Sequence, residues 1–490
     1  MVANSRQESM ESLLQLERTS NAFFDNLSSE IGFPADQLKY VLCMLLTYPA
    51  AFVYKGLPRN NPALKHIFNI VLSISFTIFC LGPFAWLHSF FTALVAYLIL
   101  IVVPHGTAHK VVFAWVLGYM SVSHIYRQWV DYMGWTLDFT TMQMVLTLRL
   151  TSFAYNYYDG NNPNATAEQK KRSIKTLPGI LEYYGFVYFF CSYLAGPAIE
   201  ISEYQNHING KMFDDKYCQG KIPSTIVPAL KSLFKAFVLY LPVTFLSASY
   251  PMAYLISEEF LLHAPVWEKI IRVYFHPTLC RFKYYYAWSL TEGACNACGI
   301  GYNGVDKNGN PLWDRGSNVD VLAVEMAPNM RSVTTYWNMK TGDWLKNYVY
   351  LRLTPEGSKP SFFSTVATYS VSAFWHGFYP GYYLFFLLSA IYTEVAKDVR
   401  RVVRPFFVTS DDKPKYPSKY LYDIGTIIVT SWFLNYAGTS FLYLSLENAM
   451  KLYTNLYFSG HIIAVIALIL FRFVFVQKRS PRPATTKKAQ

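Results

Sequence analysis

Two polar residues, His376 and Asn338, stand in segments where they could do chemistry together. His376 lies in SAFWHGFYPGYYLFF, residues 372–386, where apolar and aromatic side chains surround a single imidazole. An imidazole has an unperturbed pKa of about 6.5, so at cellular pH it is largely neutral and can accept a proton. Asn338 lies 38 residues earlier in YWNMKTGDWLKNYVYLRL, residues 336–353, and its amide can both donate and accept hydrogen bonds. By itself a surface asparagine proves little, so the residue types alone leave open whether either side chain is catalytic.

The apolar run before His376 predicts a helix that starts near Ser361 and places the imidazole deep in a membrane. Fifteen residues at 1.5 Å each carry the chain roughly 22 Å, which is past the midplane of a hydrocarbon core about 30 Å thick. Pro380 and Gly381 predict a break before the next apolar run. Ionisable groups at such depth are costly and usually functional, although a structural hydrogen bond to a neighbouring helix is the alternative.

The segment around Asn338 is amphipathic. Trp337, Trp344, Tyr348 and Leu351 recur at helical spacing with basic residues between them, which predicts an interfacial helix.

Composition indicates a membrane protein. Of 490 residues, 52% are hydrophobic and 15% are charged, against about 25% charged in an average soluble domain. We predict an all-α polytopic protein with about 11 transmembrane helices, together with re-entrant or interfacial ones. The apolar segments that predict them are 40–53, 67–87, 90–103, 111–125, 142–155, 180–194, 233–248, 270–287, 361–374, 381–396, 424–444 and 462–476.

The polar ends of the chain flank this apolar part. Residues 1–38 form a polar, acidic segment without the basic head and apolar run of a signal peptide. Residues 39–477 are predicted to form one transmembrane domain, and residues 478–490 a basic tail.

Basic loops predict the orientation in the membrane. Lys and Arg gather in residues 156–177, 329–360 and 397–419 and in the tail, and the positive-inside rule places all four in the cytosol. The sequon at Asn164 is then on the wrong side for glycosylation. The net charge of +12 is explained by the same bias, so no nucleic-acid partner is expected. The terminal KKAQ is similar to the dilysine retrieval signal of endoplasmic reticulum membrane proteins; binding of the tail to anionic lipid is the alternative.

A third polar and aromatic cluster is RFKYYYAWSLTEGACNACGIGYNG, residues 281–304. Glu292 is its carboxylate, and it could either form an ion pair, for example with Arg149, or line a substrate tunnel. Cys295 and Cys298 lack a second pair or histidines, so no metal site is expected. GIGYNG lacks the features of a nucleotide loop.

Four motifs in order resemble those of the membrane-bound O-acyltransferase family, in its lysophospholipid acyltransferase branch. The resemblance covers residues from about 40 to 477. The motifs are LPGILEYYGFVYFFCSYLAGP (177–197), YYAWSLTEGACNACGIGYNG (285–304), WNMKTGDWLKNYVYLR (337–352) and WHGFYPGYYLFF (375–386). A departure is GACNACG, where relatives have larger apolar residues between the cysteines.

The resemblance implies transfer of an acyl group from acyl-CoA to the free hydroxyl of a lysophospholipid, in a reaction chamber inside the membrane. His376 would be the general base on that hydroxyl. Asn338 would orient the histidine, bind the acceptor or donate to the developing oxyanion. No cofactor is expected beyond acyl-CoA as co-substrate, and the sequence does not indicate an oligomeric state.

The motifs also imply binding residues. Those expected to contact substrate are Tyr285, Trp288, Glu292, Tyr302, Asn303, Trp337 and Trp375. Those expected to contact the CoA phosphates on the cytosolic side are Arg331, Lys340, Lys346 and Arg352, for which ordinary positive-inside bias is the alternative.

Two other functions fit part of the pattern. One is an acyltransferase of the same family that uses a sterol, diacylglycerol or protein acceptor. The other is a polytopic transporter in which His376 relays protons, although paired intramembrane carboxylates or an internal repeat would then be expected. A non-catalytic scaffold would leave the presence of both Asn338 and His376 unexplained.

Overall fold

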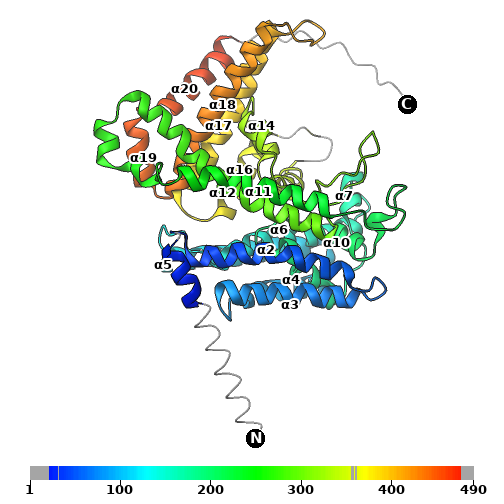
Figure 1. Cartoon of the computed structure of the whole chain (residues 1–490). Helices are drawn as coiled ribbons and strands as arrows, with labels where there is room; N and C mark the ends of the chain where they lie inside the picture. The colour runs from blue at the N-terminus through cyan, green and yellow to red at the C-terminus, as the bar shows by residue number, and fades with distance from the viewer. Residues whose placement is uncertain (1–20, 31, 355–357, 359–360, 476–490) are drawn as a thin grey trace. The chain divides into compact units, whose positions relative to one another are not determined.

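Helices form nearly all of the regular structure in the described part of the chain, which comprises residues 21–30, 32–354, 358 and 361–475 of a computed structural model (Figure 1). The only strand-like pairing in these residues consists of isolated β-bridges. The prediction of an all-α protein is therefore confirmed. The chain divides into two compact units: Met1–Tyr240 with Tyr284–Asn318, and Leu241–Lys283 with Val319–Gln490.

The first unit contains α2 (Ala35–Gly56), α3 (Pro62–Leu81), α4 (Trp86–Val102), α5 (His105–Val130), α6 (Thr140–Gly160), α7 (Ala167–Arg172), α8 (Ile180–Val187), α9 (Phe190–Tyr193), α10 (Ile201–Ile208) and η1 (Lys211–Phe213). Two long helices, α11 (Ile226–Leu246) and α12 (Val266–Cys298), contribute residues to both units.

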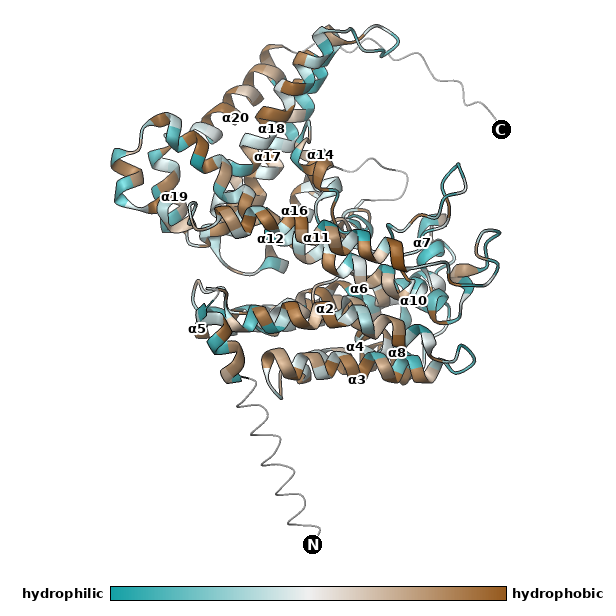
Figure 2. Ribbon diagram, in the orientation of Figure 1, coloured by the Kyte–Doolittle hydropathy of each residue, from teal (hydrophilic) through white to brown (hydrophobic). Residues whose placement is uncertain are grey.

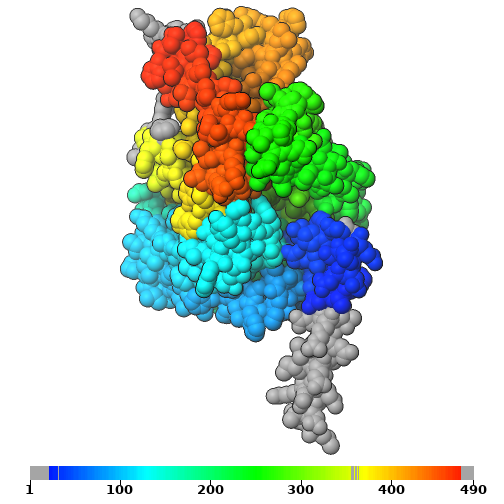
Figure 3. Space-filling view, turned by 90° about the vertical axis from the view of Figure 1, so that its left-hand side faces the viewer, coloured from blue at the N-terminus to red at the C-terminus, as the bar shows by residue number. Residues whose placement is uncertain are grey.

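The second unit contains η2 (Met252–Ile256), η3 (Glu259–His263), α13 (Val321–Glu325), α14 (Met330–Tyr336), α15 (Met339–Trp344), η4 (Leu345–Tyr350), α16 (Phe362–His376), α17 (Pro380–Val403), η5 (Arg404–Phe407), α18 (Ser418–Tyr443), α19 (Leu446–Asn455), α20 (Ser459–Ile469) and η6 (Leu470–Val474). Within it, η2 packs against α19, and Figure 3 shows the η2–η3 segment in green beside the orange-red α19 and α20.

Apolar residues follow the helices, and hydrophilic residues gather in the loops (Figure 2). Among the described residues, α3 and α11 are each long and apolar enough to cross a membrane. The bent pair formed by α19 and α20–η6, with 74° between its halves, could be a third span. Most described residues of the predicted apolar segments lie in helices. The number of about 11 crossings and the single domain over 39–477 stay predictions.

Buried polar side chains explain why several long helices are not uniformly apolar. In α6, Gln143, Arg149 and Asn156 are all buried. Gly82, at a φ of +88°, ends α3, so that the span predicted at 67–87 is the helix Pro62–Leu81 instead. Glycine tolerates this left-handed region because it has no Cβ.

Arg149 holds the irregular chain between α8 and α9. Its guanidinium is 1% exposed and donates to the carbonyl oxygens of Val187 at 2.9 Å and Ser192 at 2.7 Å. Val187 is the last residue of α8, and the carbonyl oxygen of Ser192 accepts in addition from the amide of Gly196 at 3.1 Å. A buried carbonyl without a donor costs free energy. Arg149 thus stabilises the turn between two short helices. The predicted ion pair between Arg149 and Glu292 is wrong, because both groups have other partners.

The start of α17 lies directly against the end of α18. The amide of Gly381 donates to the carbonyl oxygen of Leu444 at 2.7 Å. A Cβ at position 381 would lie 2.1 Å from the carbonyl oxygen of Ser440 and 2.8 Å from that of Leu444. Only glycine permits this approach, since both obstacles are backbone atoms.

An ion pair in the second unit joins three helices. Arg281 of α12 donates through Nε and Nη2 to the two carboxylate oxygens of Glu325 in α13, at 3.0 and 2.8 Å. Its Nη1 donates to Oδ1 of Asn435 in α18 at 2.6 Å. A bidentate guanidinium–carboxylate contact fixes direction as well as distance. Arg281 therefore fixes the position of α13. The chain runs from this helix towards Asn338.

Replacing Gly381 with alanine is expected to destabilise the protein by about 1–3 kcal/mol, because the new methyl group would meet backbone atoms that cannot rotate away. The apparent unfolding temperature of purified protein in detergent measures the effect. Gly425→Ala is the matched control: it also lies in a helix, α18, but its Cβ would have no neighbour within 4 Å. Equal unfolding temperatures for the two variants would contradict the close contact.

Replacing Glu325 with glutamine is expected to lower stability by about 3–5 kcal/mol, because it leaves the buried guanidinium of Arg281 without its counter-charge. Thermal unfolding again provides the measurement. Glu447→Gln is the control, since the side chains of Glu447 and Lys451 are 76% and 51% exposed, and such pairs contribute about 0–1 kcal/mol. Similar small losses of stability in both variants would show that the buried ion pair contributes no more to stability than the exposed one.

Candidate active site

His376 is the last residue of α16. The helix begins after Ser361, whose side chain accepts a hydrogen bond from the amide of Ser364, as the sequence predicts. It ends because Gly377 takes a φ of +124° and donates back to the carbonyl oxygens of Ala373 and Phe374. The break predicted at Pro380 and Gly381 is therefore misplaced: Pro380 is the first residue of α17, where its fixed φ suits a helix start.

Aromatic rings from three helices surround the half-buried imidazole of His376. Trp375 lies at 4.7 Å and Phe441, edge-on, at 5.0 Å between ring centroids. Phe386 lies at 5.3 Å and Tyr382 at 5.6 Å. Such walls restrict the imidazole to few orientations and exclude water from one side of it. They also offer the apolar surface that a long acyl chain needs.

Only some of these aromatic residues lie near His376 in the sequence. Trp375, Tyr382 and Phe386 belong to the motif that contains His376 and could be read from the sequence. Phe441 comes from α18, and the close contact of α17 with α18 at Gly381 brings it there. No sequence pattern pointed to Phe441.

Asn338 lies between α14 and α15 in a left-handed conformation, with φ +47° and ψ +52°. Asparagine is one of the few residues other than glycine that tolerate this region. Its carbonyl oxygen accepts from the amide of Gly342 at 2.9 Å, while its side chain makes no capping hydrogen bond to α15. The amide is therefore not used to start the helix that follows it.

A short backbone pairing fixes the position of Asn338. Val319 and Trp337 form an isolated antiparallel bridge, and the amide of Asp320 donates to the carbonyl oxygen of Tyr336 at 3.1 Å. Backbone pairing on one side and the turn at Asn338 on the other leave this residue little freedom. A non-glycine residue held in a left-handed conformation is a reason to look for function there.

The segments that carry Asn338 and His376 pack together within the second unit. The helical stretch α15–η4 follows Asn338, and η4 lies against α16, whose last residue is His376. In the same unit α14 lies against α17. The predicted amphipathic helix is present as α15–η4. Trp344 and Tyr348, which were expected at the membrane interface, are buried in the protein.

The four basic residues expected to meet CoA lie before and after Asn338 in the second unit, from Arg331 in α14 to Arg352 after η4. Arg331 and Lys346 are exposed, whereas Lys340 and Arg352 are partly buried. The Nε of Arg352 donates to the carbonyl oxygen of Asn347 at 3.2 Å. Their place beside Asn338 in the chain is consistent with a phosphate-binding role, which stays a prediction.

The remaining predicted substrate residues, apart from Trp337 and Trp375, belong to the first unit. Tyr285, Trp288 and Glu292 are buried on α12. Glu292 pairs with the Nζ of Lys235 at 2.6 Å and accepts from the Oγ of Ser317 at 2.5 Å. These partners give Glu292 a structural role, and lining of a tunnel stays a prediction.

The GIGYNG segment is held by side chains of its own unit. Tyr302 is 1% exposed and donates its hydroxyl hydrogen to Asp215. Asn303 is exposed and donates to Asp314 at 2.9 Å. Both residues have structural partners, and contact with substrate stays a prediction for each.

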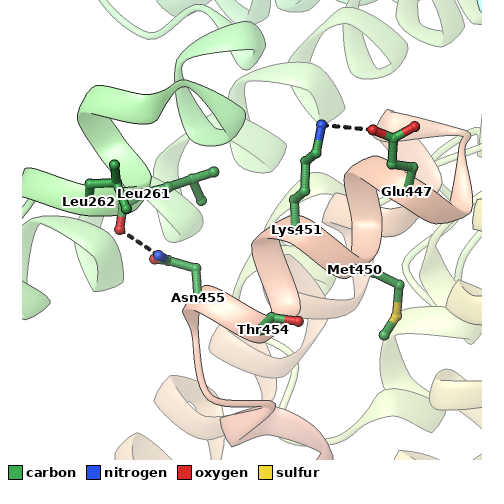
Figure 4. Close-up of a pocket in the computed structure, with 7 residues that line it drawn as sticks. All are labelled: Leu261, Leu262, Glu447, Met450, Lys451, Thr454 and Asn455. Carbon is green, nitrogen blue, oxygen red and sulfur yellow. Dashed lines mark hydrogen bonds and ion pairs between the residues drawn. The ribbon is translucent and has the colours of Figure 1, made fainter.

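A surface pocket of about 510 Å³ in the second unit contains none of these residues. Figure 4 shows that it lies between η3 and α19, with Asn455 donating to the carbonyl oxygen of Leu261 and Lys451 paired with Glu447. Its lining has no imidazole, and its carboxylate, Glu447, is paired with Lys451. We therefore place the candidate active site at His376 rather than here. Its lining residues are Leu261, Leu262, Glu447, Met450, Lys451, Thr454 and Asn455.

Comparison with known proteins identifies the family. The model of the MBOAT, membrane-bound O-acyltransferase family matches residues 124–439, a region that includes both Asn338 and His376. The chain is 37% identical to the lysophospholipid acyltransferase of Schizosaccharomyces pombe over 454 residues, which cover 91% of this chain and 88% of that protein.

Two further relatives are similar over most of their length. The lysophospholipid acyltransferase of Saccharomyces cerevisiae is 32% identical over 476 residues, covering 92% of this chain and 76% of that protein. The human membrane-bound glycerophospholipid O-acyltransferase 1 is 31% identical over 481 residues, covering 95% and 94%. With a family match over more than half of its length and these identities, the chain belongs to the membrane-bound O-acyltransferase family.

Proposed function

We propose that this membrane acyltransferase transfers a fatty acyl group from acyl-CoA to the free hydroxyl of a lysophospholipid, as part of phospholipid remodelling. The observation that carries the proposal is the environment of His376: an imidazole at a helix end, walled by four aromatic rings, on a helix packed against the segment that follows Asn338. Several relatives named lysophospholipid acyltransferases support the acceptor.

His376 acts as the general base. Its neutral imidazole takes the proton from the acceptor hydroxyl while the hydroxyl oxygen attacks the thioester carbonyl carbon. The resulting tetrahedral intermediate expels the CoA sulfur, which takes the proton back from the imidazolium. The products are the phospholipid ester and free CoA, so that no other reactant is needed. General base catalysis contributes roughly 10²–10⁴-fold to such a step.

Asn338 acts on the oxygen that becomes negative. Its side-chain NH₂ donates to the thioester carbonyl oxygen as charge develops there, and one such donor is worth about 10²–10³ in turnover. The left-handed backbone and the neighbouring bridge hold the amide in place before substrate arrives. A site built in advance in this way needs no reorganisation during the reaction.

The location is part of the proposal. Arg331, Lys340, Lys346 and Arg352 receive the phosphates of CoA from the cytosol, while the lysophospholipid enters from the bilayer. The protein resides in the endoplasmic reticulum membrane with its C-terminus in the cytosol, where KKAQ would act as a retrieval signal; Lys487 and Lys488 lie outside the described residues. Family membership makes a proton-relaying transporter unnecessary as an explanation of His376.

His376→Ala is expected to lower acyl transfer by about 10²-fold or more, because the hydroxyl loses the group that takes its proton. Purified protein is given a panel of lysophospholipids with labelled oleoyl-CoA, and the products are read by mass spectrometry. His263→Ala is the control, since this histidine is exposed on η3. Wild-type turnover in His376→Ala would contradict the assignment of His376 as the base. Acylation of a sterol or diacylglycerol, rather than of a lysophospholipid, would contradict the proposed acceptor.

Asn338→Gly is expected to lower kcat by about 10²–10³-fold without lowering stability, because glycine keeps the left-handed backbone and loses only the amide side chain. Asn338→Ala should lose both activity and some stability, since alanine is strained at this φ. Comparison of kcat and unfolding temperature for the two variants separates the roles of side chain and backbone. Full turnover in Asn338→Gly would show that the amide has no part in the reaction.

A further inference from the structure

His376 gains little support from its own helix. It is the last residue of α16, and the chain leaves the helix at once through Gly377, whose φ is +124°. In a helix, a side chain leans towards the residues three and four positions earlier. Here those residues are Ala373 and Ser372, whose side chains are small. The orientation of the imidazole therefore depends mainly on side chains from elsewhere in the fold.

Phe441 of α18 connects the aromatic rings around this imidazole. Its ring centroid lies 5.0 Å from that of His376, with 85° between the planes. It also contacts three rings of α17, with centroid distances of 4.7 Å to Tyr382, 5.4 Å to Phe385 and 6.4 Å to Phe386. Two of these rings, Tyr382 and Phe386, contact His376 themselves. Loss of the Phe441 ring would thus free the imidazole both directly and through the rings beside it.

The backbone at the end of α18 fixes the place of Phe441. Leu444, which ends this helix, has a φ of +62°, a value that residues with a Cβ rarely adopt. Its carbonyl oxygen accepts from the amide of Gly381 at 2.7 Å. A strained residue persists only where its surroundings hold it, and such residues gather at functional sites. Because α17 packs against both α16 and α18 (Figure 1), this contact holds the last turn of α18, with Phe441, beside His376.

We propose that Phe441 is a positioning residue for acyl transfer: its ring holds the imidazole of His376 in the orientation in which one nitrogen faces the acceptor hydroxyl. The inference rests on the proposed role of His376 as the general base. A phenyl ring has no group that transfers a proton, so Phe441 acts only through the histidine. An imidazole that turns about its side-chain bonds points its basic nitrogen elsewhere, and a displacement of about 1 Å at a reacting atom can cost about 10²-fold in rate.

Phe433 offers a matched comparison on the same helix. Like Phe441, it is partly buried in α18, about two turns earlier. Its described ring contacts are with Tyr392 of α17, at 4.4 Å between centroids, and with Trp432, at 5.4 Å. Both phenylalanines thus join α18 to a tyrosine of α17, and Phe441 does so beside the histidine. A purely structural role would make the two positions equivalent for catalysis.

Phe441→Leu is expected to lower kcat by about 10- to 100-fold without raising KM for acyl-CoA or lysophospholipid, because leucine fills much of the space but no longer restricts the imidazole. Phe441→Tyr keeps a ring at this position and should retain most of the wild-type kcat. Phe433→Leu should lower the unfolding temperature as much as Phe441→Leu does and leave kcat unchanged. Turnover of labelled oleoyl-CoA by purified full-length protein in detergent measures all three variants. Equal kcat values for the two leucine variants would overturn the proposal.

Chemical modification of His376 tests the contact without relying on the reaction. Diethyl pyrocarbonate modifies neutral imidazoles, and mass spectrometry of the peptide that contains His376 follows the rate. This rate should rise several-fold in Phe441→Leu, because the imidazole loses the ring beside it, and should keep its wild-type value in Phe433→Leu. An unchanged rate in Phe441→Leu would also overturn the proposal. Failure of the proposed function is a separate result, since it requires wild-type turnover in His376→Ala, which would refute the base and with it any residue that positions it.

Discussion

A polar side chain buried among these helices requires a partner, because the apolar surroundings offer no water to replace one. The first unit meets this requirement with Arg149, which holds the carbonyls between α8 and α9, and with the pair of Glu292 and Lys235. The second meets it with Arg281, which binds Glu325 and Asn435. These contacts do not drive folding by themselves, but breaking one leaves a buried charge unpaired. They therefore fix which helices lie together.

The same requirement gives meaning to the exceptions. Both ring nitrogens of His207 are buried without a hydrogen-bond partner among the described residues, whereas His66 is paired with Tyr204. At His376 the surroundings are aromatic, which suits a base that must meet both a lipid hydroxyl and an acyl thioester. Polar groups with hydrogen-bond or ion-pair partners inside the protein thus have a structural role, and Glu292 is one of them.

Local sequence was enough to predict the helix that carries His376 and a helical stretch after Asn338, because apolar periodicity is a local property. It was not enough for the partners of charged residues. Glu292 pairs with Lys235 rather than with Arg149, because helix packing decides which charged side chains meet. The end of α16 was also misplaced by several residues, since the positive φ of Gly377, and not Pro380, stops the helix.

The sequence by itself determined the all-α class, the membrane character, the family and the two residues on which catalysis is proposed to rest. These follow from composition, hydropathy and motifs that are each contiguous in the chain. Only the tertiary structure decided that Phe441 completes the aromatic wall of His376, since this requires the contact of α17 with α18 that Gly381 permits. It also decided that Glu292 pairs with Lys235, because pairing between distant residues depends on helix packing and leaves no local pattern in the sequence.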